Sequence, residues 1–206
     1  MRTSINRKIT ILCTIFFLAF CTFLGLTNTK AYCMTTNLTS SKINEAIEYG
    51  KTNKLESLGK FTKPWVSHLG EKVGWATIWT PYHNVAFKSK KAAVERRNLS
   101  QDEIFKALRL KNNLTFTVSL FGDYMQFARG YNAILYCNEK IIYPVLSYFP
   151  EYAEPSSFYP ESPVYVAGFV YKFPTEDVIN DSVINLVVTD PEGHEFKFPF
   201  DLSTIN

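Results

Sequence analysis

The sequence predicts a mainly β, α+β fold in which a helical N-terminal segment packs on an antiparallel immunoglobulin-like β-sandwich. Two observations predict this fold. Apolar residues recur at helical spacing in the first part of the chain and alternate with polar residues in the second. The charge changes at the same place, because residues 32–111 carry fourteen basic and seven acidic side chains, whereas residues 112–206 carry four and twelve. We therefore expect a basic helical segment over 32–111 and an acidic β-sandwich domain over 112–206.

The first 31 residues have the features of a secretory signal peptide. Arg2, Arg7 and Lys8 precede an uncharged apolar run, 9–26, and a small-residue cleavage site ends at Ala31. The sequence therefore predicts an exported protein, either secreted or periplasmic. The alternative is an uncleaved N-terminal membrane anchor, since eighteen helical residues extend roughly 27 Å and a bilayer core is about 30 Å thick.

Two cysteines remain after the signal peptide, Cys33 and Cys137. An even pair in an oxidising compartment is typical of a disulfide, which would join the mature N-terminus to the β-rich part. The alternative is two thiols, because sequence does not supply the distance that a disulfide requires.

Three helices are expected in the segment 32–111. Ser41 is suited to cap a short helix that ends before Gly50. Thr80 followed by Pro81 is a stronger start signal, because a capping hydroxyl precedes proline at the first helical position. The small apolar residues that follow Pro81 at helical spacing predict close packing against a neighbouring helix. Ser100 and Glu103 have the spacing of a capping box for the third helix.

Antiparallel strands are expected in the segment 112–206. Alternation and turn residues predict strands over 114–120, 131–137, 140–149, 164–173, 183–189 and 195–202. Pro144 would place the third of these strands at an edge or a bulge. The turn Asp190–Gly193 joins the last two strands into a hairpin.

Sequence motifs that support common enzymatic chemistries are absent. There is no nucleophile elbow, phosphate-binding loop, dinucleotide fingerprint or zinc-protease motif in the chain. Asp190, Glu192 and Glu195 surround His194 like a metal or acid–base cluster, but the Pro-x-Gly sequence between them is typical of a solvated turn. We therefore predict no catalytic residue, no metal site and no cofactor.

The stretch 64–83 is the best candidate for a ligand site, because it holds all three tryptophans and two of the three histidines. Aromatic faces beside polar groups suit sugars and other amphipathic ligands. The candidate binding residues are Trp65, His68, Glu71, Trp75, Trp79, Tyr82 and His83. The alternative is that the tryptophans belong to the core, as large aromatic side chains are usually buried.

The stretch 88–111 has eight basic and three acidic residues. Its candidate contacts to an anionic membrane surface or polysaccharide are Lys88, Lys90, Lys91, Arg96 and Arg97. Interrupting acidic residues, the lack of interleaved aromatics beyond Phe105 and the predicted export argue against nucleic acid as the partner. The alternative is that this stretch is only the solvated side of two helices.

These observations favour an exported, non-catalytic binding or interaction protein of the cell envelope or extracellular space. Its partner would be a surface glycan or an envelope protein. One alternative is an exported hydrolase whose site in 64–83 uses His68, Glu71 or His83. Another is a structural envelope component held at the membrane.

Overall fold

The structure, a computed structural model, describes residues 38–109, 113–138, 140–178 and 183–205. It contains two antiparallel sheets and few helices, so the fold is α+β with mainly β character. The segment 1–31 and Cys33 lie outside the described residues, together with the predictions made for them. No helix within the described ranges is both long and apolar enough to cross a membrane.

Capping residues determine where the helices begin. The helical elements are α2 (Ser40–Thr52), α3 (Leu58–Thr62), η1 (Lys63–Trp65), α4 (Pro81–Val94), α5 (Gln101–Leu108) and η2 (Thr175–Asp177). The hydroxyl of Thr80 accepts a hydrogen bond from the His83 N–H, and Pro81 is the first residue of α4. Ser100 and Glu103 form the capping box of α5. Both predicted starts are thus confirmed, whereas α2 is capped by Thr39 rather than Ser41.

Helices α2 and α4 cross at small residues. Gly50 lies inside α2, so the prediction that this helix ends before Gly50 is wrong. A Cβ atom at Gly50 would lie 2.3 Å from the carbonyl oxygen of Ala86, which explains why glycine occupies this position. The Ser89 hydroxyl donates to the carbonyl of Ile47 across the same crossing, at 2.8 Å. The close packing predicted from the small apolar stripe of α4 is therefore confirmed.

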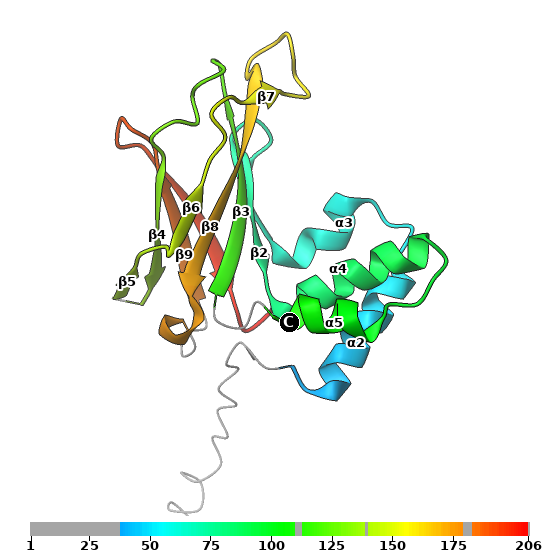
Figure 1. Ribbon diagram of the computed structural model, residues 1–206. Helices are drawn as coiled ribbons and strands as arrows, with labels where there is room; N and C mark the ends of the chain where they lie inside the picture. The colour runs from blue at the N-terminus through cyan, green and yellow to red at the C-terminus, as the bar shows by residue number, and fades with distance from the viewer. Residues whose placement is uncertain (1–37, 110–112, 139, 179–182, 206) are drawn as a thin grey trace, which may run out of the picture. The chain divides into compact units, whose positions relative to one another are not determined.

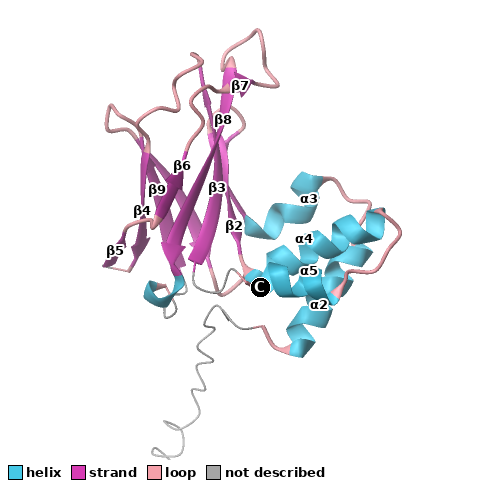
Figure 2. Cartoon of the chain, in the orientation of Figure 1, coloured by secondary structure: helices cyan, strands magenta, loops and turns pink. Residues whose placement is uncertain are grey.

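The strands form two sheets, and every neighbouring pair is antiparallel. Sheet A has the order β1-β2-β3-β8-β6, with β7 also paired to β8, and consists of β1 (Val66–Gly70), β2 (Gly74–Trp79), β3 (Asn113–Gly122), β6 (Leu146–Tyr148), β7 (Glu154–Pro155) and β8 (Tyr165–Pro174). Sheet B has the order β10-β9-β4-β5 and consists of β4 (Asn132–Cys137), β5 (Lys140–Ile142), β9 (Val183–Thr189) and β10 (Glu195–Asp201). The predicted hairpin of β9 and β10 is confirmed by their antiparallel pairing. Figure 2 shows the strands in magenta and the helices in cyan.

The two sheets share one buried apolar core. Alternate residues of β3, including Phe116, face β10 and bring the rings of Phe116 and Phe200 to 5.3 Å. Tyr131, next to β4, lies 5.2 Å from Phe169 of β8. The other face of sheet A carries Trp75 and other residues that do not enter this core, and that face is where the cavity described below lies.

Two segments pair differently from the expected pattern. Strands β1 and β2 come from the segment 32–111, for which only helices were expected. Sheet A therefore combines residues of the basic segment 32–111 with residues of the acidic segment 112–206. The strand expected over 140–149 is interrupted at Tyr143–Val145, so that β5 joins sheet B and β6 joins sheet A. Pro144 lies in this interruption and explains it, because proline has no backbone N–H to donate to a neighbouring strand. Figure 1 shows β5 and β6 on the side of the sheets away from the helices.

Candidate ligand-binding cavity

The hairpin of β1 and β2 positions the aromatic side chains of the candidate site. Both ends of its turn are glycines with positive φ, 143° at Gly70 and 146° at Gly74. A Cβ atom at Gly74 would lie 2.2 Å from the carbonyl oxygen of Ser119, so β2 can pair this closely with β3 only when residue 74 is glycine. Side chains alternate along a strand, and Trp75 and Trp79 therefore share the outer face of sheet A.

A cavity of about 510 Å³ lies on this outer face, between sheet A and helices α3 and α4. Helix α3 forms one side and Phe87 of α4 contributes an aromatic ring, while the remaining side chains come from β1, β2 and β3. Leu58 and Gly59 are exposed, so they lie where the cavity opens to solvent. The lining consists of Leu58, Gly59, Thr62, Val66, His68, Trp75, Thr77, Trp79, Phe87 and Thr117.

The cavity lining is apolar and aromatic, with a few hydroxyl groups. The indole N–H of Trp79 donates to the Thr117 hydroxyl at 2.9 Å, and this bond fixes the ring orientation. The Thr62 hydroxyl donates to the Leu58 carbonyl, so it is already engaged within α3. Among the described residues, no Asp, Glu, Lys or Arg lines the cavity, and His68 is its only ionisable side chain. Such a lining suits an uncharged ligand with an apolar face.

A stack of three rings supports the cavity from behind. The His83 ring lies between two indoles, 4.2 Å from Trp65 and 4.3 Å from Trp79, with interplanar angles of 1° and 9°. His83 is fully buried, and Trp65 is 2% exposed. The stack joins η1, β2 and α4, so the ring of Trp79 is held in place at the cavity.

The protonation state of His83 follows from its surroundings. Its Nδ1 lies 3.1 Å from the carbonyl oxygen of Ile78, which can only accept, so Nδ1 carries the proton. Its Nε2 is buried, and no group in the described part of the chain forms a hydrogen bond with it. Burial lowers the pKa of His83 to about 4, although the hydrogen bond to Ile78 acts in the opposite direction. His83 is therefore neutral at pH 7.

The structure brings three of the seven predicted binding residues to the cavity. His68, Trp75 and Trp79 line it. Trp65, Tyr82 and His83 are buried core residues, and Glu71 is exposed in the turn between β1 and β2. Binding by any of these residues stays a prediction.

Sequence reasoning did not identify the lining residues outside 64–83. Leu58, Gly59 and Thr62 belong to a helix of only five residues, which periodicity does not detect. Phe87 lies one helical turn after His83, so helical spacing from the aromatic stretch is a signal that could have identified it. Thr117 is one of several alternating hydroxyl residues of β3, and nothing local distinguishes it from the others.

The residues proposed for a hydrolase are placed differently from one another. Of His68, Glu71 and His83, only His68 lines the cavity. His83 is sealed between two indoles and holds a backbone carbonyl through Nδ1. A proton transfer from this cavity would therefore have to use His68.

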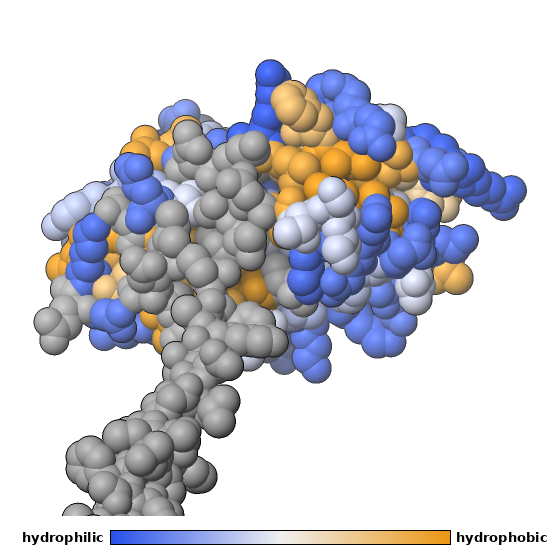
Figure 3. Space-filling model, turned by 90° about the horizontal axis from the view of Figure 1, so that it is seen from below, coloured by the Kyte–Doolittle hydropathy of each residue, from blue (hydrophilic) through white to orange (hydrophobic). Residues whose placement is uncertain are grey.

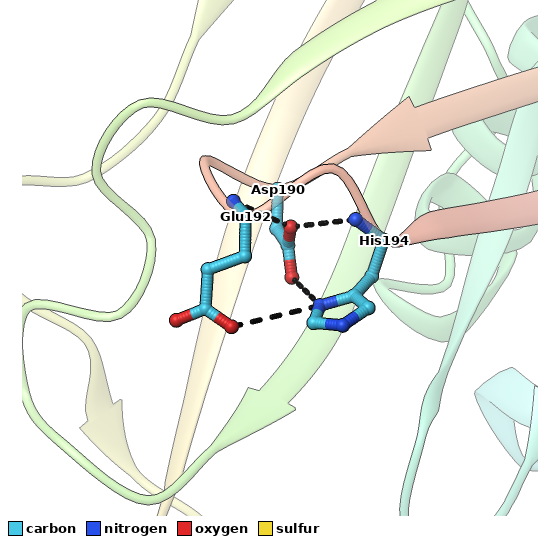
Figure 4. Close-up of side chains that lie close together, drawn as sticks. All are labelled: Asp190, Glu192 and His194. Carbon is cyan, nitrogen blue, oxygen red and sulfur yellow. Dashed lines mark hydrogen bonds and ion pairs between the residues drawn. The ribbon is translucent and has the colours of Figure 1, made fainter.

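The acidic cluster beside His194 has the geometry of a hydrogen-bonded turn (Figure 4). Asp190 Oδ1 accepts from the backbone N–H groups of Glu192 and His194, at 2.9 and 2.8 Å. Asp190 Oδ2 lies 2.9 Å from His194 Nδ1, and this hydrogen bond raises the pKa of His194. The three side chains are close enough to hold a cation. However, both carboxylate oxygens of Asp190 already form hydrogen bonds within the turn.

The basic stretch contains both exposed and internally bonded cations. Lys91 and Arg96 are exposed and Lys88 is half-buried. The Lys90 ammonium donates to three backbone carbonyls of the loop after α2, and Arg97 pairs with Glu95 and with both carboxylate oxygens of Glu103. Seen from below, hydrophilic side chains surround an apolar area on the side of the helices (Figure 3). Binding of an anionic surface by this stretch stays a prediction, with Lys88, Lys91 and Arg96 as its best-placed residues.

Cys137 is buried at the end of β4. Its predicted disulfide partner, Cys33, lies outside the described residues, so the pairing stays a prediction.

Comparison with known proteins leaves the function to be inferred from this geometry, since no family model and no curated protein matches the chain.

Proposed function

We propose that this chain is an exported, non-catalytic binding protein whose ligand occupies the cavity between α3, α4 and sheet A. One observation carries the proposal, namely that three aromatic rings line an open cavity of about 510 Å³. Small-molecule sites in proteins commonly have volumes of roughly 300–1,000 Å³ and mostly apolar walls with a few polar groups. Export is supported by the signal-like sequence of residues 1–31.

The chemistry of the lining favours an uncharged ligand. A neutral sugar has an apolar ring face that packs on an indole, and hydroxyl groups that bond to threonine side chains. Trp75 and Trp79 supply the aromatic faces, and Thr77 and Thr117 supply hydroxyls. A charged ligand would lose hydration without gaining an ion pair here. A neutral surface glycan is therefore the ligand class that we favour.

An immunoglobulin-like arrangement of the strands is part of the same proposal. Its support is that two antiparallel sheets share one core and that β9 and β10 form a tight hairpin. In such an arrangement the sheets act as a rigid support, and the specific contacts come from the elements added to one face.

Ligand binding is tested by titrating tryptophan fluorescence with neutral oligosaccharides such as chitotetraose and maltotetraose. Two of the three tryptophans line the cavity, and the third stacks on His83 behind it. The blocking variant is Gly59→Leu, because Gly59 lines the cavity and a Cβ atom there meets nothing within 4 Å, so a larger side chain can be accommodated beside the ligand's place. The matched control is Gly168→Leu, which adds the same side chain to open space on β8, outside the cavity lining.

We expect saturable changes in emission whose Kd rises at least tenfold in Gly59→Leu and stays unchanged in Gly168→Leu. Equal binding by both variants, or no binding of any neutral glycan, would reject the cavity as a glycan site. Chromatography of the recovered oligosaccharide separates binding from hydrolysis. Cleavage that His68→Ala abolishes would establish the hydrolase alternative instead.

A further inference from the structure

The segment Lys140–Tyr152 exposes an unusual amount of apolar side chain. Tyr143 is 70% exposed, Val145 63% and Tyr148 57%. The only charged residues in this segment are Lys140 and Glu151, one near each end. Its exposed large apolar residues, which we call the edge patch, are Ile141, Tyr143, Val145, Leu146, Tyr148, Phe149 and Tyr152.

The edge patch follows one side of both sheets. Strand β5 is the last strand of sheet B, and β6 is the last strand of the main path of sheet A. The segment that contains them crosses from one sheet to the other, on the side away from the helices (Figure 1). Ile142 is the inward residue of β5, opposite Leu135, whereas Ile141 points outward. The patch therefore lies outside the core, and residues elsewhere in the described chain leave it exposed.

The opposite edge of sheet B differs sharply in composition. Strand β10 carries Glu195, Lys197 and Asp201 at exposed positions, with Pro199 between them. Charged residues and proline at an edge strand are common protection against association. The edge patch has no charged side chain of this kind, so nothing in its composition opposes contact with another protein.

Proline limits the kind of contact that the edge patch can make. Pro144 precedes β6 and Pro150 follows it closely, so β6 has only three residues. Among the described strands, β6 pairs with β8 alone. Addition of a long partner strand is therefore disfavoured. Contact through the exposed side chains is the mode that remains.

The edge patch is held in place before any partner binds. The backbone N–H of Val145 donates to the Lys172 carbonyl, and that of Ala153 donates to the Met125 carbonyl, both at 2.7 Å. Arg129 pairs with Glu151 at 3.1 Å and lies over the ring of Tyr152. A surface that is already ordered loses little conformational entropy on binding, which favours association.

We propose that the edge patch binds the edge patch of a second copy of this chain in a two-fold symmetric dimer. The seven side chains are 39–70% exposed. Together they offer at most on the order of 700 Å², close to the roughly 800 Å² that each partner buries in a stable complex. Depletion of charge and enrichment in Tyr and Phe are typical of interface centres. The seven side chains of the patch are uncharged, and Arg129 beside Tyr152 is paired with Glu151, so the patch can face its own copy without net electrostatic repulsion.

Sedimentation velocity of the purified protein between about 1 and 100 µM tests this proposal. The disrupting variant is Tyr143→Lys with Val145→Lys, since both side chains are largely exposed and their replacement does not disturb the core. The control is Leu55→Lys with Val94→Lys, which adds the same two charges at exposed positions on the helical side. We expect the wild type and the control to sediment as dimers and the disrupting variant as a monomer, with a dimer Kd at least a hundredfold higher. Circular dichroism establishes that both variants fold.

A monomeric wild type at 100 µM, or a dimer that the edge substitutions leave intact, would overturn the proposal. Flotation with neutral phosphatidylcholine vesicles identifies the other use of such a surface. A monomer that floats with vesicles, and loses this property in the edge variant, would show that the patch faces lipid instead. Oligomerisation and glycan binding are separable, because Gly59→Leu lies in α3 and leaves the edge patch unchanged.

Discussion

The rings of His83 and Trp79 lie nearly parallel at 4.3 Å, and Trp79 also lines the cavity. His83 is the central ring of the stack, with Trp65 on its other face. One buried histidine thus supports a wall of the candidate site while it contributes to the core. Because Trp79 takes part in both, we expect changes in His83 to affect global stability and the geometry of the cavity together.

The first prediction concerns the pH dependence of stability. Well above pH 6.5, the pKa of an unperturbed histidine, His83 is neutral in both the folded and the unfolded chain, so it contributes no pH dependence. As the pH falls from 6.5 to about 4, His83 becomes protonated in the unfolded chain but stays neutral in the folded chain, where it is buried. The free energy of unfolding should therefore decrease over this range, by about 3 kcal/mol in total. Urea denaturation at a series of pH values measures this decrease.

The variant His83→Asn is the control for this effect. Its side-chain amide can donate to the Ile78 carbonyl in place of Nδ1, but it does not titrate. We expect His83→Asn to be less stable than the wild type at pH 7, because the ring stack is lost. The difference in free energy of unfolding between the wild type and His83→Asn should become smaller as the pH falls towards 4, because only the wild type loses stability through His83. Parallel stability curves would show that His83 titrates in the folded chain as it does in the unfolded one.

The second prediction concerns the crossing of α2 and α4. In Gly50→Ala the new methyl group would meet the Ala86 carbonyl, the Lys90 nitrogen and the Ser89 Cβ within 2.7 Å. Overpacking of this kind costs about 1–3 kcal/mol, which exceeds the helix-propensity gain of about 1 kcal/mol. We therefore expect a net loss of up to about 2 kcal/mol in the free energy of unfolding, measured by chemical denaturation. Gly59→Ala in α3 is the matched control and should be stabilising, because its Cβ meets nothing. An equal response of both variants would contradict the close crossing.

Local signals in the sequence predicted the starts of α4 and α5 and the last hairpin correctly. The capping groups of Thr80 and Ser100 bond within three residues of themselves, so their geometry is contained in the local sequence. The hairpin of β9 and β10 is likewise closed by a short turn. By contrast, Gly50 looked like a helix end because its role depends on Ala86, which is distant in sequence.

The cavity could be predicted only in part for the same reason. The stretch 64–83 was predicted as the candidate site from its aromatic residues, without a strand. In the structure, alternation along β2 places Trp75, Thr77 and Trp79 on the face that lines the cavity. Whether a tryptophan lines a cavity or fills the core depends on what packs against it. Here Trp65 is covered by α2 and α4 rings, whereas Trp75 is left partly exposed. No local pattern contains that difference, and none relates Thr117 to Trp79.

The third prediction separates structural from surface lysines in the basic stretch. The Lys90 ammonium donates to the carbonyls of Asn53, Lys54 and Glu56 at 2.7–2.9 Å and lies over the Phe61 ring. Lys90→Gln leaves these carbonyls without their cation, so we expect a loss of about 2 kcal/mol in the free energy of unfolding. Lys91→Gln, at the exposed neighbouring position, should change it by less than about 0.5 kcal/mol. Similar losses in both variants would show that Lys90 does not hold this loop.

The fourth prediction uses the backbone of Arg96, which has φ 57° at the end of α4. The N–H groups of Arg96 and Arg97 bond to the carbonyls of Ala93 and Ala92, a helix ending in which glycine is preferred. Arg96→Gly should therefore raise the free energy of unfolding, by up to about 1 kcal/mol after the greater entropy of glycine in the unfolded chain is included. Arg96→Ala retains the strained backbone conformation, so we expect no increase in its free energy of unfolding, as measured by urea denaturation.

The same pair of variants tests whether Arg96 contacts an anionic surface, because both remove the guanidinium while only one relieves the backbone. If Arg96 contributes, salt-sensitive binding to vesicles that contain anionic lipid should weaken equally in Arg96→Gly and Arg96→Ala. Stability should differ between them, since only glycine adopts this φ without strain. If Arg96→Gly binds as the wild type does and only Arg96→Ala binds more weakly, the surface recognises the backbone conformation at the end of α4 and not the guanidinium of Arg96. Binding unchanged in both would remove Arg96 from the predicted anionic contacts.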